Sequence, residues 1–307
     1  MALQGSGQIS FSQIENEFGQ NGERSIGDYR TQQSVGELSN LPLDSGIPTS
    51  GEIKFSDFYS KRLNIVVDMH SGGDEFRKSA KNDKWNNNNL TVIGGFRSKK
   101  EDGSKIIIHV NKTFGSDKSS VNNCAVRTGS WNSSSTIQVD VGGEGEILGA
   151  GGDGGSGGNC TSSGQPGGSG TSGLGIDHNG VTVNVGSGGL IRAGFGGGGG
   201  GGGGQGFPGG SGGDGPGGCA GAQDGSAGDK TEAGEGGGGG NNGNQAYGAG
   251  GGEGGSFGEA ANGGGSAQAG GGGAGGDGAA IRRIGGYSVT INNSGTIQGN
   301  TTATGVS

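Results

Sequence analysis

Few residues of this chain have the type and spacing that catalysis or metal binding requires. The three histidines, His70, His109 and His178, are scattered, and no plausible Ser or Cys nucleophile accompanies them. The carboxylates Glu144 and Glu146 sit in a strand-turn pattern, where we expect them to face solvent. We therefore expect no catalytic residue, no metal site and no cofactor, which means that the chain is not an enzyme.

Cysteine and glycine motifs give no chemical site either. Cys124, Cys160 and Cys219 lie far apart without a CxxC pair, which predicts free thiols. GxGxxG matches are numerous, but glycine supplies 85 of the 307 residues, so these matches arise by chance. None of them joins a predicted strand to a predicted helix, as a dinucleotide site would require.

Recognition is better served by the aromatic and amide residues that interrupt the glycine tracts. Exposed rings stack on sugar faces or apolar surfaces, while Asn and Gln supply adaptable hydrogen bonds. The same rings are equally suited to plugging the open ends of packed tracts, and both interpretations stay open. The candidate residues for receptor binding are Phe207, Pro208, Asn241, Asn242, Gln245, Tyr247 and Phe257.

These candidates must be positioned by the glycine tracts. Glycine occupies every third position from 194 to 221, a period that fits the three residues per turn of polyproline II. Such rods have no internal hydrogen bonds, so only a mutually bonded polyglycine-II bundle is expected to be stable. Collagen is excluded because the chain has five prolines, whereas a flexible linker remains the alternative.

The sequence pattern before residue 140 predicts a β-sheet. Apolar runs bounded by polar turns predict an antiparallel β-sandwich over residues 62–141, whose small size calls for support from neighbouring regions. The fold class is therefore mainly β, with a small antiparallel sandwich followed by the polyglycine-II bundle. The five predicted strands span residues 63–69, 90–96, 105–114, 124–131 and 136–141.

Two internal repeats organise the chain. The pattern SG-x-I-x-F-S occurs at 6–12 and at 50–56, and its last Ser is placed to cap a short helix that starts at residue 13 or 57. A nine-residue pattern recurs at 139–147, 183–191 and 289–297. We interpret each copy as a short β-hairpin that anchors the glycine tracts.

Three domains follow from these patterns. Residues 1–61 form an attachment or assembly segment, residues 62–141 the sandwich, and residues 142–307 the glycine-rich domain with a terminal β element. Residues 140–307 carry four basic groups against thirteen acidic ones, which disfavours nucleic acid and anionic membranes as partners. The start of the chain predicts no signal peptide, so we expect synthesis in a cytoplasm.

Three elements together resemble glycine-rich tail proteins of tailed bacteriophages. They are the repeat at 289–297 with copies leading into glycine runs, the Arg127-Thr128-Gly129-Ser130-Trp131 element, and the SG-x-I-x-F-S repeats. Within that group, tip adhesins of long tail fibres carry a polyglycine-II sandwich whose end loops bind outer-membrane proteins or surface polysaccharide. The N-terminal part, with its repeats and its β region, departs from the short attachment domain of those adhesins.

The resemblance implies a tail-fibre or tail-tip adhesin in the virion tail. Its expected partners are other tail, baseplate or fibre proteins and a host outer-surface protein or polysaccharide, with a homotrimer as one option. The N-terminal region would attach the chain to the virion. The apolar residues expected to mediate this attachment are Ile9, Phe11, Ile14, Ile53, Phe55 and Phe58.

Two other functions are compatible with glycine-rich rods. A structural tail or baseplate protein would use the tracts as a rigid spacer without touching a receptor. An ice-binding polyglycine-II protein would be expected to show flat Thr/Ala-rich faces and a secretion signal, and neither is evident in the sequence.

Overall fold

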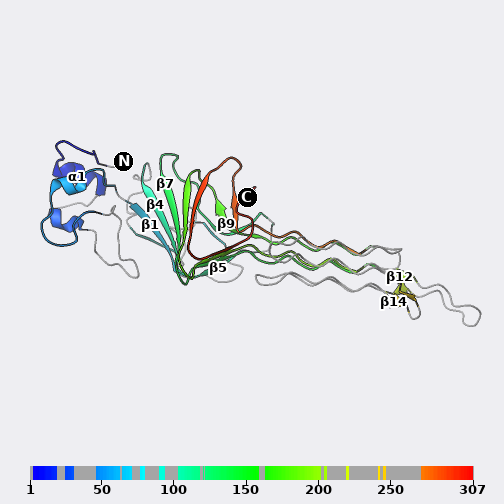
Figure 1. The fold of residues 1–307 in the computed structure, drawn as a ribbon. Helices are drawn as coiled ribbons and strands as arrows, with labels where there is room; N and C mark the ends of the chain where they lie inside the picture. The colour runs from blue at the N-terminus through cyan, green and yellow to red at the C-terminus, as the bar shows by residue number, and fades with distance from the viewer. Residues whose placement is uncertain are drawn as a thin grey trace, which may run out of the picture.

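The computed structural model shows an elongated, mainly β molecule with three parts (Figure 1). A small N-terminal unit with helix α1 (Phe11–Phe18) lies at one end, strands form the middle, and glycine tracts project from the opposite side. Within the described part of the chain, no helix is long and apolar enough to cross a membrane. The structure describes residues 3–18, 25–30, 46–62, 64–70, 77–79, 90–93, 103–117, 120, 122–158, 163–201, 204–205, 219–220, 241–242, 245–246 and 271–306.

The middle part is a three-sided solenoid of parallel strands. The chain visits three sheets in turn and then repeats the circuit one layer further along, so each strand pairs with its equivalents in the turns before and after. The turns comprise β4 (Lys105–Val110), β5 (Thr113–Gly115) and β6 (Cys124–Arg127); β7 (Thr136–Val141), β8 (Glu146–Leu148) and β9 (Ser172–Ile176); β10 (Val181–Val185), β11 (Leu190–Arg192) and β16 (Ile281–Arg283); and β17 (Val289–Asn293), β18 (Thr296–Gln298) and β19 (Ala303–Thr304).

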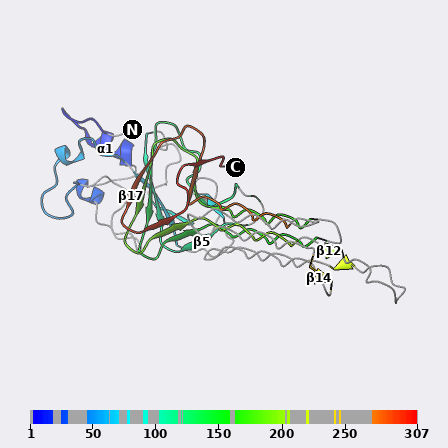
Figure 2. The same ribbon diagram turned by 45° about the vertical axis from the view of Figure 1, so that its right-hand side comes forward.

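The two ends of the solenoid differ. An incomplete first turn contributes β1 (Asn64–Met69), which pairs in parallel with β4, and β2 (Lys78–Ser79), which pairs in parallel with β6. Strand β3 (Leu90–Ile93) then pairs antiparallel with β1 and forms the outer edge of the largest sheet. At the other end, β17, β18 and β19 each form an outer edge (Figure 2).

The predicted antiparallel sandwich is therefore wrong, although the mainly β class is right. Alternation of inward and outward side chains is the same in a sandwich strand and a solenoid strand, so it does not identify the neighbouring strand. In β4 and β7 every second residue is apolar and buried, while the residues between them, which include Ile107, are partly or fully exposed. The segment predicted as one strand at 105–114 turns a corner between β4 and β5, and that at 124–131 ends at Arg127.

The nine-residue repeats are stacked corners of the solenoid, not hairpins. Val139 pairs with Val183, which pairs with Ile291, while Ile147 pairs with Ile191, which pairs with Ile297. The two strands within each copy belong to different sheets. Copies of one pattern stack because each layer must place the same kind of side chain at the same position.

The glycine tracts leave the solenoid at a single corner, between its second and third sheets. Tract A (149–158) and tract B (163–171) connect β8 to β9, whereas tract C (193–201) and tract D (271–280) belong to the connection from β11 to β16. The solenoid thus runs through both of the segments that the sequence separates at residue 142. Figures 1 and 2 show the tracts extending side by side away from this corner.

Hydrogen bonds join the four tracts at every third residue. Every residue of tract C is buried, so this tract lies at the centre of the described rods. All of the bonds span 2.7–3.0 Å and link backbone amides to carbonyl oxygens. From tract A to tract C, residues 149, 152, 155 and 158 donate to the carbonyl oxygens of 192, 195, 198 and 201. From B to A, residues 165, 168 and 171 donate to 156, 153 and 150, and from C to B, residues 194, 197 and 200 donate to 171, 168 and 165. From D to C, residues 272, 275 and 278 donate to 200, 197 and 194, and from B to D, residues 167 and 170 donate to 273 and 276.

Glycine is required in these tracts because the backbones touch. A Cβ atom added at Gly194, Gly197 or Gly200 would lie 1.9–2.0 Å from a carbonyl oxygen of tract A. Real Cβ atoms do not approach oxygen so closely, so any side chain would force the rods apart. The position of Phe195 in tract C is less restricted, since this side chain is accommodated there with 6% exposure.

The two SG-x-I-x-F-S repeats fold together into the N-terminal unit. The first copy leads into α1, and the second leads into the 3-10 helix η2 (Phe55–Phe58). A capping box starts α1, because Ser10 and Gln13 exchange hydrogen bonds between side chain and backbone. The predicted cap at the last Ser of the pattern is therefore two residues too late. The unit's buried core consists of Ile9, Ile14, Phe18, Tyr29, Ile47 and Phe58, with Tyr29 supplied by the 3-10 helix η1 (Ile26–Tyr29).

Candidate functional site

Two short hairpins lie at the far end of the glycine tracts. Strand β12 (Gly204–Gln205) pairs antiparallel with β13 (Cys219–Ala220), and β14 (Asn241–Asn242) pairs antiparallel with β15 (Gln245–Ala246). Strand β14 contacts both β12 and β13, so the hairpins are neighbours (Figure 1). Segments far apart in sequence thus meet at the end opposite the N-terminal unit.

This distal end contains three of the predicted recognition residues. Asn242 pairs with Gln245 across the second hairpin, and Asn241 pairs with Ala246. Gln205 of the first hairpin, which sequence analysis did not select, pairs with Cys219 nearby. Its signal was available, because Gln205 interrupts the longest glycine run. The other four candidates, Phe207, Pro208, Tyr247 and Phe257, lie outside the described residues.

The predicted attachment residues all belong to the N-terminal unit, with different exposures. Ile9, Ile14 and Phe58 are buried in its core, and Phe11 and Ile53 are partly buried against that core. These five residues hold the two repeats together. The sixth, Phe55, is 44% exposed, and it is the member of the set with the most surface available to a partner.

Phe55 and Phe11 occupy equivalent positions in the two repeats but have different surroundings. The ring of Phe11 lies edge-on to Tyr29, with ring centroids 6.1 Å apart. Tyr59 of the second repeat donates its hydroxyl hydrogen to the Gly7 carbonyl of the first. These contacts join the two repeats, whereas the side chain of Phe55 is exposed.

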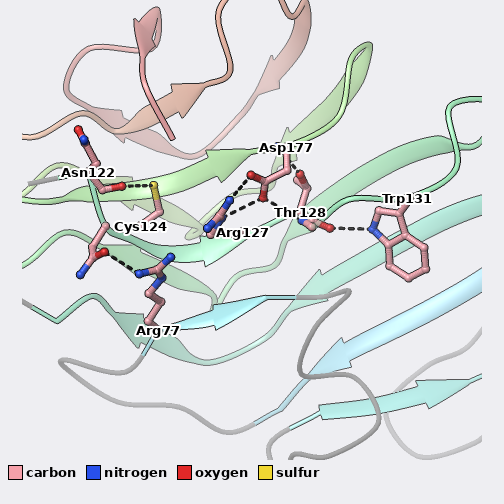
Figure 3. Close-up of polar contacts among 9 residues, drawn as sticks. Arg77, Asn122, Cys124, Arg127, Thr128, Trp131 and Asp177 are labelled. Atoms are coloured by element: carbon pink, nitrogen blue, oxygen red, sulfur yellow. Dashed lines mark hydrogen bonds and ion pairs between the residues drawn. The ribbon is translucent and has the colours of Figure 1, made fainter. Parts of the chain in front are cut away.

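An ion pair between a partly buried arginine and a buried aspartate braces one solenoid corner (Figure 3). Arg127, at the end of β6, donates two hydrogen bonds to the carboxylate of Asp177, which follows β9. The same carboxylate accepts the amide of Gly129 at 3.1 Å, and Thr128 Oγ1 accepts the amide of Asp177 at 2.9 Å. Trp131 completes the network by donating its Nε1 hydrogen to the Thr128 carbonyl at 2.7 Å.

This network contains four of the five residues of the RTGSW element, all except the exposed Ser130, and gives them a structural role. It joins two successive turns of the solenoid at the corner that leads to β7 and β10. The hydrogen bond to Asp177 raises the pKa of Arg127 further, so the guanidinium stays charged. With 2% of the Asp177 side chain exposed, the carboxylate is not presented to a ligand.

Cys124 and the histidines are also held by structural contacts. Burial raises the pKa of the Cys124 thiol to about 11, so the nucleophilic thiolate is scarce at neutral pH. Both ring nitrogens of His178 lie at hydrogen-bond distance from backbone carbonyl oxygens, those of Asn179 and Asn132. Among the described residues, no group of three or more His, Cys, Asp or Glu side chains is placed to hold a metal ion.

A ladder of polar residues crosses the outer face of the largest sheet. The strand registers align these residues on five neighbouring strands. Asn292 donates an amide hydrogen to Asn184, and Asn184 donates one to Asp140, at 2.8 and 2.7 Å. Sequence analysis missed this ladder because it depends on the parallel register. Its members are Asp68, His109, Asp140, Asn184 and Asn292.

Comparison with known proteins gives a family match over most of the chain. The model of the family described as phage tail fibre adhesin Gp38 matches residues 75–302, which include the glycine tracts and the solenoid from β2 to β18. Among solved structures, the crystal structure of the gp37-gp38 adhesin tip complex of the bacteriophage S16 long tail fiber is similar, with 20% identity and a TM-score of 0.37. That similarity covers 83% of this chain and 89% of the other. No curated protein matches the sequence.

Proposed function

Because the chain belongs to the phage tail fibre adhesin Gp38 family, we propose that it binds a host-cell surface receptor through the distal end of its glycine tracts. The N-terminal unit attaches it to another protein of the tail fibre or baseplate. The single observation that carries this assignment of ends is the projection of all described tracts from one solenoid corner, opposite the N-terminal unit (Figure 1).

The rigidity of the projection comes from polyglycine-II packing. Bonds that recur every third residue are what rods with three residues per turn would make with their neighbours. Tracts A, B and C bond in a closed triangle, and tracts B, C and D form a second triangle that shares the B–C edge. A triangulated set of rods resists bending better than a flat sheet, so it can hold loops at a distance from the solenoid.

The described residues of the distal end include several that suit recognition through hydrogen bonds. Hairpins β12–β13 and β14–β15 bring Gln205, Asn241, Asn242 and Gln245 into one region. Primary amides donate and accept hydrogen bonds at once, which suits both sugar hydroxyls and the polar groups of exposed protein loops. The receptor is therefore a host outer-surface protein or polysaccharide, and Phe207, Pro208, Tyr247 and Phe257 are further contact candidates.

Attachment to the virion is assigned to Phe55 and its surroundings. An exposed aromatic ring on a small, separately packed unit provides apolar area for burial against a partner. The other apolar residues of the two repeats contribute indirectly, since they stabilise the unit that presents Phe55. We further propose that the chain acts by binding alone, without catalysis or a cofactor.

Adsorption competition tests the function. Purified protein should block attachment of the phage to its host in a dose-dependent way, because it occupies the same receptor. The matched control replaces Asn241, Asn242 and Gln245 with Ala and should lose the block while keeping the circular dichroism of the parent. Failure of the folded parent to compete at saturating concentration favours the alternative, a structural tail or baseplate protein without receptor contact.

A further inference from the structure

The outer face of the largest sheet carries a regular grid of mostly polar side chains. Strands β4, β7, β10 and β17 are neighbours in this sheet, so residues that share a register position form rows across it. Ile107, Gln138, Thr182 and Thr290 form one row, and the polar ladder forms the next row, two residues further along each strand. Neighbouring strands lie about 4.8 Å apart and alternate residues of one strand about 6.6 Å apart, so the grid repeats evenly in both directions.

This grid is accessible from solvent. In β7 and β10 the residues of the two rows are partly exposed, whereas the residues between them are buried. In β17, Thr290 and Asn292 are exposed. Because β7 and β10 are paired with a strand on both sides, a partner that approaches these two strands meets side chains and not open backbone groups.

The side chains of the grid keep hydrogen-bonding capacity after the ladder has formed. A primary amide has two N–H donors and an oxygen with two acceptor lone pairs. Asn184 uses one N–H toward Asp140 and one lone pair toward Asn292, which leaves one donor and one acceptor site. Within the described part of the chain, the hydroxyls of Thr182 and Thr290 have no hydrogen-bond partner. The face therefore offers donors and acceptors side by side.

The ladder also holds these groups in place. Asp140 accepts hydrogen bonds from Gln138 on its own strand and from Asn184 on the next, at 2.7–2.9 Å. Asn184 in turn fixes the amide of Asn292 at 2.8 Å. Side chains that are already fixed lose little rotamer freedom on binding, so more of each new hydrogen bond contributes to affinity.

The composition of the face selects among classes of ligand. Apart from His109, the charged groups on these four strands are Lys105 and Asp140, which have opposite signs, so a polyanion such as nucleic acid gains little there. Peptides usually bind in apolar grooves or add a strand to an open sheet edge, and the outer face of β7 and β10 offers no such edge. Sugar hydroxyls donate and accept hydrogen bonds at once, as these amides and hydroxyls do. A neutral oligosaccharide therefore matches the face best, and the partly exposed Ile107 adds an apolar contact for a sugar ring.

We propose that the outer face of β7, β10 and β17 is a second binding site, which takes a neutral surface polysaccharide of the host laid across the strands. The strand spacing is close to the length of one unit of an extended polysaccharide, so consecutive sugar units meet consecutive strands. Gln138, Thr182 and Thr290 contact the sugar hydroxyls along one side of the polysaccharide, and Asn184 and Asn292 contact them along the other. The site lies on the solenoid, so it does not depend on receptor contact at the distal hairpins.

Nuclear magnetic resonance titration tests this site. The probe is neutral polysaccharide released from the surface of the host cells, which is added to isotopically labelled full-length protein. The side-chain amide signals of Gln138, Asn184 and Asn292 should shift in a saturable way. The double variant Thr182→Val and Thr290→Val keeps the branched shape of both side chains but removes two hydroxyls, and it should raise the Kd about tenfold.

Two control variants separate this face from the rest of the molecule. Thr296→Val combined with Thr304→Val makes the same change at exposed threonines of the other two sheets, and this variant should bind like the parent. The variant with Ala at Asn241, Asn242 and Gln245 changes the distal hairpins alone. It should keep the polysaccharide-induced shifts of the solenoid face even where it no longer blocks adsorption.

Several results would overturn the proposal. They are a parent without saturable shifts, a Kd that the Thr182 and Thr290 substitutions leave unchanged, and an equal loss of affinity in the Thr296 and Thr304 control. Loss of binding in the distal variant alone would assign the polysaccharide to the distal hairpins, which contradicts this site and supports the proposed function. The shifts of the parent test the site even where a variant fails to fold.

Discussion

Asp177 is the carboxylate on which the hydrogen bonds of the solenoid corner converge. It accepts hydrogen bonds from Arg127 and from the Gly129 amide, and its own amide binds Thr128. A carboxylate this buried is costly unless it is paired and hydrogen-bonded, and here both conditions hold. The RTGSW element thus marks a corner that must close in one conformation.

Removing the charge of Asp177 should destabilise the protein strongly. In Asp177→Asn the Arg127 guanidinium keeps its charge but loses its counterion, and because 22% of the Arg127 side chain is exposed, we expect a cost of about 2 kcal/mol, below that of a fully buried pair. Urea denaturation followed by tryptophan fluorescence measures the change, since Trp131 binds Thr128 in the same network. The exposed pair of Lys112 and Glu144 provides the control, and Glu144→Gln should leave the unfolding midpoint unchanged. Equal shifts of the unfolding midpoint in the two variants would show that the Asp177 pair contributes no more to stability than the exposed pair.

The raised pKa of Cys124 predicts an inert thiol. A variant with Cys160→Ser and Cys219→Ser leaves Cys124 as the single cysteine. With a pKa of about 11 in the folded state, its thiolate is a small minority at pH 8, and burial blocks access as well. Labelling with a chromogenic disulfide reagent at pH 8 should be slow in native protein and rapid in urea. Rapid labelling of the folded variant would contradict the buried position.

At the scale of elements, the glycine tracts combine rigid and permissive positions. Gly275 and Gly273 lie in the same tract, two residues apart, and both take part in its inter-tract bonds. A Cβ at Gly275 would lie 1.8 Å from Gly168 O, whereas a Cβ at Gly273 would have no atom within 4 Å. The difference arises because a Cβ at Gly275 would point at the backbone of tract B, whereas a Cβ at Gly273 would point away from the described rods.

Alanine substitution should separate these two positions. Gly275→Ala forces tracts B and D apart and should cost about 1–3 kcal/mol, as overpacking does in a dense interior. Gly273→Ala meets no obstacle, and its restriction of the unfolded chain should leave stability unchanged or raise it by up to about 1 kcal/mol. Thermal unfolding followed by calorimetry makes the comparison. Similar melting temperatures for the two variants would refute close packing of the tracts.

The sequence predicts which residues form strands and rods better than it predicts which of these elements pair with one another. Alternation located β1 and β7 to within a residue and the start of β4, and the period of three in glycine, which runs from 194 to 221, includes tract C. The parallel register remained hidden because tracts of unequal length separate the copies at 139–147, 183–191 and 289–297. Without a constant period, a stacked corner and a hairpin look alike in sequence.

The candidate site shows the same limit. Asn241, Asn242 and Gln245 were selectable as breaks in the glycine runs, and the structure places them on the distal hairpins. Gln205 and the polar ladder were missed, because their neighbours come from distant parts of the chain. Exposure of Phe55 was not predictable either, since it depends on the position of Tyr29, whose ring contacts Phe11 and Phe58 while Phe55 stays exposed.

At the scale of the whole molecule, the architecture separates two tasks. The N-terminal unit has its own core, and the distal hairpins lie beyond the glycine tracts, with the solenoid between them (Figure 1). Few contacts of one end depend on the other, so a surface substitution at either end should act locally. This independence makes the assignment of attachment and receptor binding to opposite ends testable in a single design.

Two full-length variants should fail in opposite assays. Phe55→Asp removes the exposed apolar ring from the attachment unit, and we expect about a tenfold or larger loss of incorporation into virions, while purified protein still blocks adsorption. The variant with Ala at Asn241, Asn242 and Gln245 should be incorporated normally but lose the block. Quantitative immunoblotting of purified virions measures incorporation, and adsorption competition measures receptor binding. If Phe55→Asp instead abolished the block while its fold was intact, receptor contact would have to be moved to the N-terminal unit. The glycine tracts would then be a spacer between that unit and whatever holds their distal end.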